Sequence, residues 1–203
     1  HADDVAETVL YRLFRGTGID GLQGPAKKRA LGKGMILRPW LGYTKAELSE
    51  YLLDHNINFV HDDTNLEDNQ DRNFIRNEVL KITFNRWPNA SKQIQKTADL
   101  VFRHKHAHDF LIETQFGANI KGSKLQRKFL LDLDEETCSE VIRFWIKANN
   151  FAMPNKKIIG EILKAFIFSN PSPKTQVNWS RADNDQKSAF LTFSNGDLIL
   201  NDK

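Results

Sequence analysis

Apolar side chains recur at spacings of three and four residues along most of the 203-residue chain. The clearest example lies between Pro154 and Pro171, where the apolar positions are Ile158, Ile159, Ile162, Leu163, Phe166 and Ile167. This spacing places side chains on one face of an α-helix, and that face has to be buried against a partner. We therefore expect a mainly helical protein, with β-structure confined to short segments between the helices.

The same period predicts helices in both halves of the chain. They cover residues 3–14, 44–54, 71–84 and 88–116, followed by one helix that starts at 134–136 and one that Pro154 opens. Short strands are expected at 35–38, 57–60, 175–181, 189–194 and 197–200, with a turn at 183–185 and a type I′ turn at Asn195-Gly196. Thr44 and Glu47 form a capping-box pattern. The expected fold class is mainly α with small β (α+β), ending in a small antiparallel sheet.

Residues 16–35 hold six of the eleven glycines, and they also carry the basic residues Lys27, Lys28, Arg29 and Lys33. We expect a long, flexible, basic loop. Residues 16–21 match the G-x-G-x-x-G pattern of dinucleotide-binding folds, but a helix precedes the match and none follows at once, so that interpretation is rejected. On the residues alone, contact with a phosphate backbone and a merely mobile surface loop are about equally supported.

Composition narrows the function classes. The single cysteine, Cys138, excludes an internal disulfide, a cysteine-rich zinc site and a C-x-x-C redox pair. No apolar run approaches the ~20 residues that span a bilayer, so we expect no membrane span, and a cytoplasmic location is compatible with this composition. A net charge of +3 permits nucleic-acid binding without demanding it. Because the chain begins at His1 beside a helical pattern, we suspect that an upstream part is missing.

Two clusters contain residue types that bind metals. Asp3 and Asp4, beside His1 at a helix start, could hold Mg²⁺ and orient a phosphate through it, or could simply cap the helix. Spacing alone favours capping. His104 and His108 are four residues apart, but no third ligand can be named, so a solvated helix face is the better interpretation.

A third cluster could recognise phosphate. Arg72 and Arg76 lie four residues apart on a predicted helix, so both guanidinium groups could point the same way. Paired guanidinium groups suit phosphate oxygens. The acidic residues Asp62 and Asp63 just before them could instead pair with them, and spacing alone favours that structural network.

Taken together, these stretches resemble the tRNA(Ile)-lysidine synthetase family. Residues 1–18 are similar to its HxxDDxxET…RxxRGxG element, residues 38–41 to its RPL element and residues 63–76 to its D-x-N…RN-x-x-R element. Order and distances agree over residues 1–80, and from about residue 123 the chain is similar, more loosely, to the family's substrate-binding domain. The family's SGGxDS ATP-binding loop would lie upstream of His1. Gly24-Pro25-Ala26 stands where the glycine-rich loop of the family more usually ends in Gly-Met.

The resemblance implies a remnant of an α/β PP-loop ATP-binding domain over residues 1–87, a connecting helix and linker over 88–122, and a tRNA-binding domain over 123–203. It implies an enzyme that uses ATP and Mg²⁺ to adenylate the C2 oxygen of the wobble cytidine in a tRNA(Ile) with a CAU anticodon. Free lysine then displaces AMP to form lysidine. The 203 residues of this chain would be inactive by themselves, because the ATP-binding loop lies outside them. The protein could form a homodimer.

The resemblance also assigns residues. It places His1, Asp3 and Asp4 near ATP or Mg²⁺, with Asp3 and Asp4 as the metal ligands. The catalytic set that it implies is Asp3, Asp4, Arg12, Arg15 and Arg76, with Arg12 and Arg15 near the phosphates or the target nucleotide. The residues that line or support the cleft are Asp63, Asn65, Arg72 and Asn73. Those expected to contact tRNA are Lys27, Lys28, Arg29 and Lys33.

Two alternatives remain open. One is a tRNA-thiolating enzyme of the same superfamily, which typically depends on catalytic cysteines or an iron–sulfur cluster that Cys138 alone cannot supply. The other is a non-catalytic RNA-binding or dimerisation module.

Overall fold

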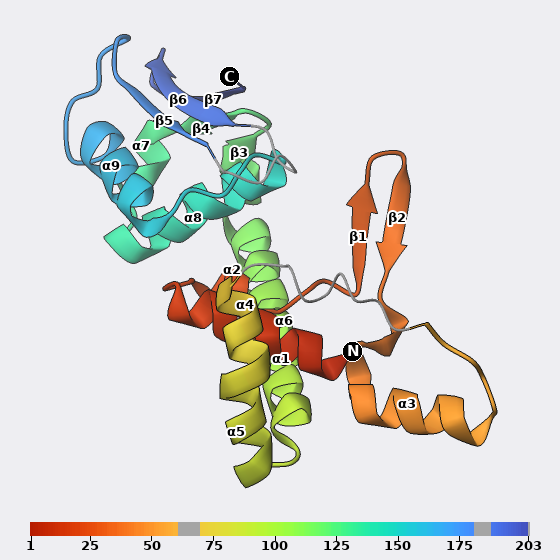
Figure 1. Ribbon diagram of the computed structural model, residues 1–203. Helices are drawn as coiled ribbons and strands as arrows, with labels where there is room; N and C mark the ends of the chain where they lie inside the picture. Colours follow the sequence, from red (N-terminus) through yellow and green to blue (C-terminus); the bar gives the residue numbers. More distant parts are fainter. Residues whose placement is uncertain (61–69, 181–187, 203) are drawn as a thin grey trace. The chain divides into compact units, whose positions relative to one another are not determined.

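The computed structural model describes residues 1–60, 70–180 and 188–202 (Figure 1). The chain divides into two compact units, 1–107 and 108–203, and the division falls inside one long helix, α6 (Ala90–Phe116). Helices with small antiparallel sheets confirm the expected fold class. Among the described residues, none of the helices combines the length and the hydropathy of a membrane-spanning segment. The predicted separate connecting part, residues 88–122, stays a prediction.

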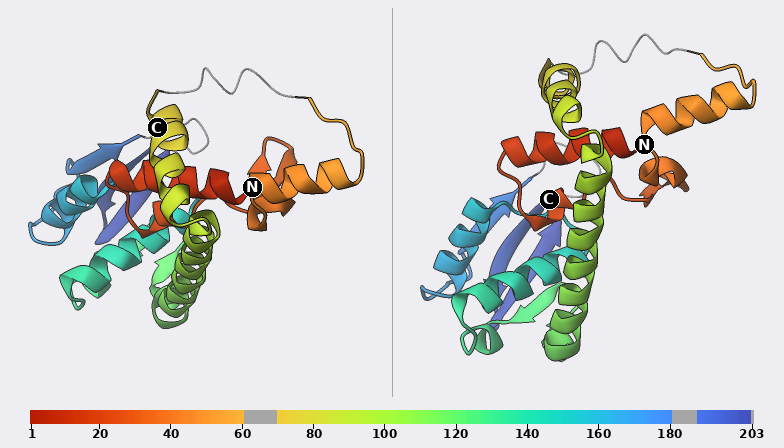
Figure 2. Two further views of the ribbon diagram at one scale, coloured as in Figure 1. Left: turned by 60° about the horizontal axis from the view of Figure 1, so that its bottom comes forward. Right: turned by 90° about the horizontal axis from the view of Figure 1, so that it is seen from below.

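Unit 1 is built on the crossing of α1 (Ala2–Phe14) with the first part of α6, which both views in Figure 2 show. Val5 of α1 and Ala98 of α6 belong to one small buried cluster. A second cluster, around Ala6, joins α1 to the helical segment of residues 70–86. Both clusters are small, so polar contacts carry much of the organisation of this unit.

The helix predicted over residues 71–84 forms, but its middle turn is wider than an α-helix. α4 (Gln70–Phe74) continues into a π-helical turn, η3 (Ile75–Val79), and then into α5 (Leu80–Arg86). The backbone N–H of Leu80 donates to the carbonyl of Ile75, five residues earlier, as a π-turn requires. This spacing brings the side chains of both residues into the buried cluster around Ala6.

Residues 16–35 are not the long flexible loop that their glycine content predicts. They form a short helix, α2 (Ile19–Leu22), and most of an antiparallel hairpin of β1 (Lys28–Leu31) and β2 (Gly34–Leu37). The two-residue connection begins with Gly32, whose φ of +55° suits a primed hairpin turn. Every residue of β1 is exposed, so this strand has no alternating pattern, and the sequence indicated only its partner.

Helix α3 (Lys45–Asp54) follows a 3-10 turn, η1 (Pro39–Gly42), and the predicted capping box at its start is confirmed. No residue of α3 is buried, and Leu53 is 71% exposed. The strand predicted at residues 57–60 is wrong, because these residues have no regular structure and pair with no described strand.

Unit 2 packs two helices, α8 (Glu135–Ala148) and α9 (Lys156–Phe166), against a five-stranded antiparallel sheet of order β3-β4-β7-β6-β5. The strands are β3 (Ile120–Lys121), β4 (Lys124–Gln126), β5 (Gln176–Trp179), β6 (Ala189–Ser194) and β7 (Asp197–Asp202). Two short turns, η4 (Gly117–Asn119) and α7 (Arg127–Leu130), flank the first two strands. One core cluster joins the helices and the sheet.

The three predicted C-terminal strands are confirmed, with β5 ending at Trp179. The turn predicted at residues 183–185 lies outside the described residues. Asn195 and Gly196 have φ values of 53° and 86°, as a type I′ turn requires. Strands β3 and β4 were not predicted, because two or three residues are too few to show an alternating pattern.

Cys138 lies in the core of unit 2 and is 1% exposed. Burial raises the pKa of its thiol to about 11, and the charges of Asp134 and Glu135 act in the same direction. Because the thiolate is the reactive form, we expect the folded chain to react with a chromogenic thiol reagent at least ~100-fold more slowly than the urea-unfolded chain. Cys138→Ala serves as the blank, and equal rates in the two states would contradict the burial of this thiol.

Candidate functional site

The N-termini of three helices, α1, α3 and α6, meet at Asp3. One carboxylate oxygen of Asp3 accepts a hydrogen bond from the backbone N–H of Lys45, the first residue of α3, at 2.8 Å. The other accepts the hydroxyl hydrogen of Ser91 in the first turn of α6. Helix N-termini carry unpaired N–H groups and partial positive charge, so this carboxylate stabilises two further helices besides its own.

Asp4 caps its own helix. The backbone nitrogen of His1 donates to Asp4 Oδ2 at 3.0 Å, and the backbone N–H of Asp4 donates to His1 Nδ1 at 3.4 Å. This reciprocal pair is a capping box with His1 at the N-cap position. The Asp4 side chain remains 50% exposed.

A second carboxylate, that of Glu47 in α3, strengthens the same junction. Lys92 of α6 donates to Glu47 Oε1 at 2.5 Å, while Glu47 Oε2 accepts the backbone N–H and the hydroxyl of Thr44 at 2.8 and 2.9 Å. The hydrogen bond from Lys92, followed by those from Thr44, lowers the pKa of Glu47 to about 2. Because α3 buries no side chain, the carboxylates of Asp3 and Glu47 are its main attachment to α1 and α6.

The described residues alone do not complete a Mg²⁺ site at this junction. Both oxygens of Asp3 already accept protein donors. Within the described ranges, no group of three or more His, Cys, Asp or Glu side chains is placed to hold a metal ion. The contacts show a capping role for both Asp3 and Asp4, and their assignment as Mg²⁺ ligands stays a prediction.

An ion pair between a buried carboxylate, that of Glu7, and a partly exposed guanidinium, that of Arg76, joins α1 to the π-turn η3. Glu7 is 5% exposed, its Oε2 accepts a hydrogen bond from Arg76 Nε at 2.8 Å, and Arg76 Nη2 forms an ion pair with the same oxygen at 2.7 Å. The acidic residues that spacing offered as partners for Arg76, Asp62 and Asp63, lie outside the described residues. Sequence reasoning missed Glu7 as a partner because the two residues are 69 positions apart.

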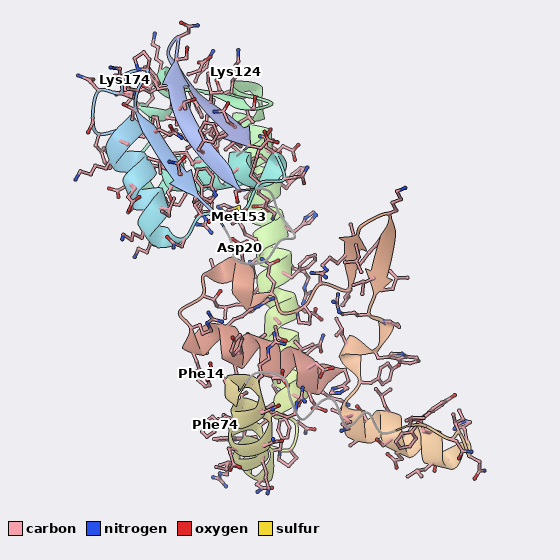
Figure 3. All side chains as sticks on the ribbon, turned by 45° about the horizontal axis from the view of Figure 1, so that its top comes forward. Phe14, Asp20, Phe74, Lys124, Met153 and Lys174 are labelled. Atoms are coloured by element: carbon pink, nitrogen blue, oxygen red, sulfur yellow. The ribbon has the colours of Figure 1, made fainter. Side chains whose placement is uncertain are left out.

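Two of the predicted site arginines meet at Tyr11. Arg15 Cζ lies 5.1 Å from the centroid of the Tyr11 ring, and Arg72 Cζ lies 5.2 Å from it. Arg15 also donates to the Tyr11 hydroxyl at 2.5 Å. Both arginines are exposed, so the ring brings two cations together at the surface, an arrangement that suits a phosphate group. Phe14 and Phe74, labelled in Figure 3, are exposed at neighbouring positions on the same two helices.

Arg12 fixes the segment that follows α1. Its Nη1 donates to the carbonyl oxygens of Gly21 at 3.1 Å and Gly24 at 3.2 Å. Gly24 has φ +69°, and a Cβ there would lie 3.1 Å from Val5 Cγ1, so a glycine is needed for this close approach. The structure thus gives Arg12 backbone partners, and its predicted place near the phosphates stays a prediction.

The four basic residues predicted to contact tRNA lie on or beside the hairpin. Lys28 and Arg29 belong to β1, Lys33 lies in the turn and Lys27 precedes the first strand. All four are exposed. Lys27 Nζ lies 3.7 Å from Asp99 Oδ1, which joins the base of the hairpin to α6 within unit 1.

The remaining predicted residues are dispersed. Asp63 and Asn65 lie outside the described residues, and Asn73 is half-buried in α4. His104 is exposed, as expected for a solvated helix face, whereas His108 is half-buried, with Nε2 3.8 Å from a Glu140 carboxylate oxygen. Neither histidine belongs to a described metal-binding group.

Comparison with known proteins gives two family matches. Residues 1–83 match the PP-loop domain, and residues 125–185 match the TilS substrate binding domain. Similar curated proteins, each named tRNA(Ile)-lysidine synthase, occur in Coxiella burnetii, Wigglesworthia glossinidia brevipalpis and Legionella pneumophila. They are 38%, 32% and 30% identical over 83%, 87% and 89% of this chain.

The chain spans only about two-fifths of the length of these relatives, namely 38%, 44% and 42%. The two matched domains nevertheless follow one another in the order that the motifs of the sequence predict. The resemblance is thereby confirmed over most of the residues, and the chain belongs to the tRNA(Ile)-lysidine synthase family.

Proposed function

We propose that this chain is part of an enzyme that joins lysine to the wobble cytidine of a tRNA(Ile) with a CAU anticodon. The observation that carries the proposal is the presence, in one chain, of a PP-loop match followed by a match to a TilS substrate binding domain. The first supports the use of ATP. The name shared by the relatives supplies the product, a lysidine in tRNA(Ile).

In the proposed reaction, the C2 oxygen of cytidine attacks the α-phosphorus of ATP and pyrophosphate leaves. The amine of free lysine then attacks C2 and loses a proton, and AMP departs with the oxygen. Adenylation is needed because a carbonyl oxygen is a poor leaving group, whereas AMP is a good one. Negative charge develops at the phosphate in the first step, so nearby cationic groups accelerate it.

We assign the stabilisation of this negative charge to Arg15 and Arg72, because both are exposed and both lie against the ring of Tyr11. Arg76, through Glu7, positions the helix that carries Arg72. Arg12 positions the segment that leads to the hairpin. The basic side chains of the hairpin suit contact with the phosphate backbone, which holds the RNA without reading its sequence.

The alternatives are less well supported. A thiolating enzyme typically depends on catalytic cysteines or an iron–sulfur cluster, and the single cysteine, Cys138, is buried with a raised pKa. A non-catalytic RNA-binding or dimerisation module would share the basic hairpin. Such a module would not incorporate lysine into tRNA, so the activity assay below distinguishes it from the enzyme. Use of Mg²⁺ and formation of a homodimer remain part of the proposal.

The decisive experiment uses the complete coding sequence that contains these residues, incubated with ATP, radiolabelled lysine and a tRNA(Ile) transcript with a CAU anticodon. We expect lysine incorporation that a GAU transcript does not support. The Arg15→Ala/Arg72→Ala variant should lose ~100-fold in single-turnover rate, because it removes charge stabilisation of the transition state. Its affinity for tRNA should change little.

Arg103→Ala, which removes an exposed arginine of α6 away from Tyr11, is the matched control and should keep the wild-type rate. Absence of lysine incorporation by the wild-type protein would overturn the proposed function. A wild-type rate in the double variant would overturn only the assignment of Arg15 and Arg72.

A further inference from the structure

Helix α9 of unit 2 presents a basic face that the packing of its unit does not explain. The buried residues of α9 are Ile159, Ile162, Leu163 and Phe166, which fix the rotation of the helix about its axis. The exposed residues on the other side, which we call the α9 face, are Lys156, Lys157, Gly160, Glu161 and Lys164. In Figure 3, nitrogen-tipped side chains project from this helix away from the sheet.

Two features of the α9 face work against the stability of the helix. Lys156 and Lys157 occupy the first turn, which holds no acidic residue and where the helix dipole repels cations. Gly160 lies in the middle of the helix, where glycine is among the least favourable residues. A Cβ at Gly160 would meet no atom within 4 Å, so no close packing contact requires glycine.

The helix itself is firmly held in unit 2. Arg127 donates to the carbonyl oxygens of Phe166 at 2.6 Å and Ser169 at 2.9 Å, which pairs groups at the C-terminal end of α9. Asn155 caps the other end by accepting the backbone N–H of Ile158 at 2.9 Å. Unfavourable residues on an exposed face of a well-anchored helix are expected where the face serves binding instead of folding.

We propose that the α9 face binds the phosphate backbone of tRNA, with Gly160 at the point of closest approach. The inference rests on the proposed function, because it names a surface for the same RNA substrate. Three lysines around the glycine supply the cations that phosphates attract. The missing side chain at Gly160 lets the RNA backbone come directly against the helix backbone.

Charge favours RNA over a protein as the occupant. The α9 face carries three lysines and no apolar side chain larger than glycine, whereas protein interfaces are depleted in lysine and enriched in aromatic residues. Glu161 is the one acid on the face, and the contacts seen in the described ranges include no ion pair between it and these lysines. The helix also lies within residues 125–185, the match to the TilS substrate binding domain.

The test measures binding of a tRNA(Ile) transcript to the 203-residue chain over a series of salt concentrations. In Lys156→Gln/Lys157→Gln/Lys164→Gln we expect at least ~10-fold weaker binding at low salt. The slope of log affinity against log salt should fall by roughly one unit for each phosphate that the variant no longer neutralises. The matched control, Lys124→Gln/Lys128→Gln/Lys174→Gln, removes equal charge from unit 2 outside the α9 face, and it should keep the wild-type slope (Figure 3 labels Lys124 and Lys174).

Gly160→Leu distinguishes an effect on tRNA binding from an effect on folding. A folding defect would lower the melting temperature together with tRNA affinity, whereas a binding role for the α9 face predicts a loss of affinity alone. Leucine is a better helix former than glycine, so the melting temperature should not fall, while tRNA affinity should drop about 10-fold. Wild-type affinity in both α9 variants, or equal losses in the lysine control, would overturn the inference and leave the proposed function standing. If the wild-type chain binds no tRNA, the inference fails as well, and lysine incorporation by the complete protein then judges the proposed function separately.

Discussion

Replacing Arg76 with Ala is expected to lower the free energy of unfolding by about 3 kcal/mol, because the substitution leaves the carboxylate of Glu7 buried without its partner. Glu7 is 5% exposed, and this one guanidinium group gives it a hydrogen bond from Nε and an ion pair with Nη2. Its helix neighbour Ala6 belongs to the buried cluster of Ile75 and Leu80. The Arg76 side chain is 41% exposed, so its removal gives water a route to the carboxylate and keeps the loss at the lower end of the range for a broken ion pair. Urea denaturation followed by circular dichroism measures the loss.

A double-mutant cycle shows whether the loss belongs to the ion pair. Arg76→Ala in a Glu7→Gln background should cost at least ~1 kcal/mol less than in the wild type, because the neutral amide needs no counter-charge. Arg76→Lys keeps the charge but not the planar fork, so its effect should be intermediate. Equal costs in both backgrounds would contradict a pairing role, and would favour the alternative that Arg76 faces the reacting phosphate.

The longer helices were predictable because each carries its own signal along the sequence, whereas the four-residue helices α2 and α7 are too short to show a helical period and were not predicted. α8 and α9 have wide apolar faces that pack into one core, and their ends carry capping residues. The π-turn within residues 75–79 was not predictable, because it depends on how Ile75 and Leu80 pack with Ala6 of α1. The β1–β2 hairpin was missed since its exposed strand has no buried face to produce an alternating pattern.

The candidate site likewise has a part that the sequence predicts, the identity of several residues, and a part that only the structure provides, the contacts between them. Motifs identified Asp3, Arg15 and Arg72 as residues of interest, but a motif does not state which contacts its members make. The structure gives Asp3 two helix N-termini as partners and places both arginines on Tyr11. Partners such as Glu7 and Arg76, or Asp3 and Ser91, are 69 and 88 residues apart, so no local pattern could connect them.

Replacing Asp3 with Ala is expected to loosen α3 while the rest of unit 1 stays folded. The substitution removes two hydrogen bonds to one charged acceptor, those from Lys45 N–H and the Ser91 hydroxyl, and these are worth about 2 kcal/mol together. Since α3 buries no side chain, its main remaining attachment within the described residues is the hydrogen bond from Lys92 to Glu47, so α3 should loosen without detaching. Amide hydrogen exchange within α3 should become ~30-fold faster, whereas the amides of α8 and α9 should be unaffected.

Asp3→Asn and Asp4→Ala complete this experiment. The amide oxygen of Asn can accept one of the two hydrogen bonds, so exchange in α3 should rise only partly. Asp4 bonds within its own helix start, through His1, and Asp4→Ala should loosen the first turn of α1 but leave α3 protected. If Asp3→Ala leaves exchange in α3 unchanged yet abolishes ATP–pyrophosphate exchange in the complete protein, the junction role is wrong. Asp3 would then serve the nucleotide, as the motif predicts, because its loss would act on the reaction without acting on the helix that it joins.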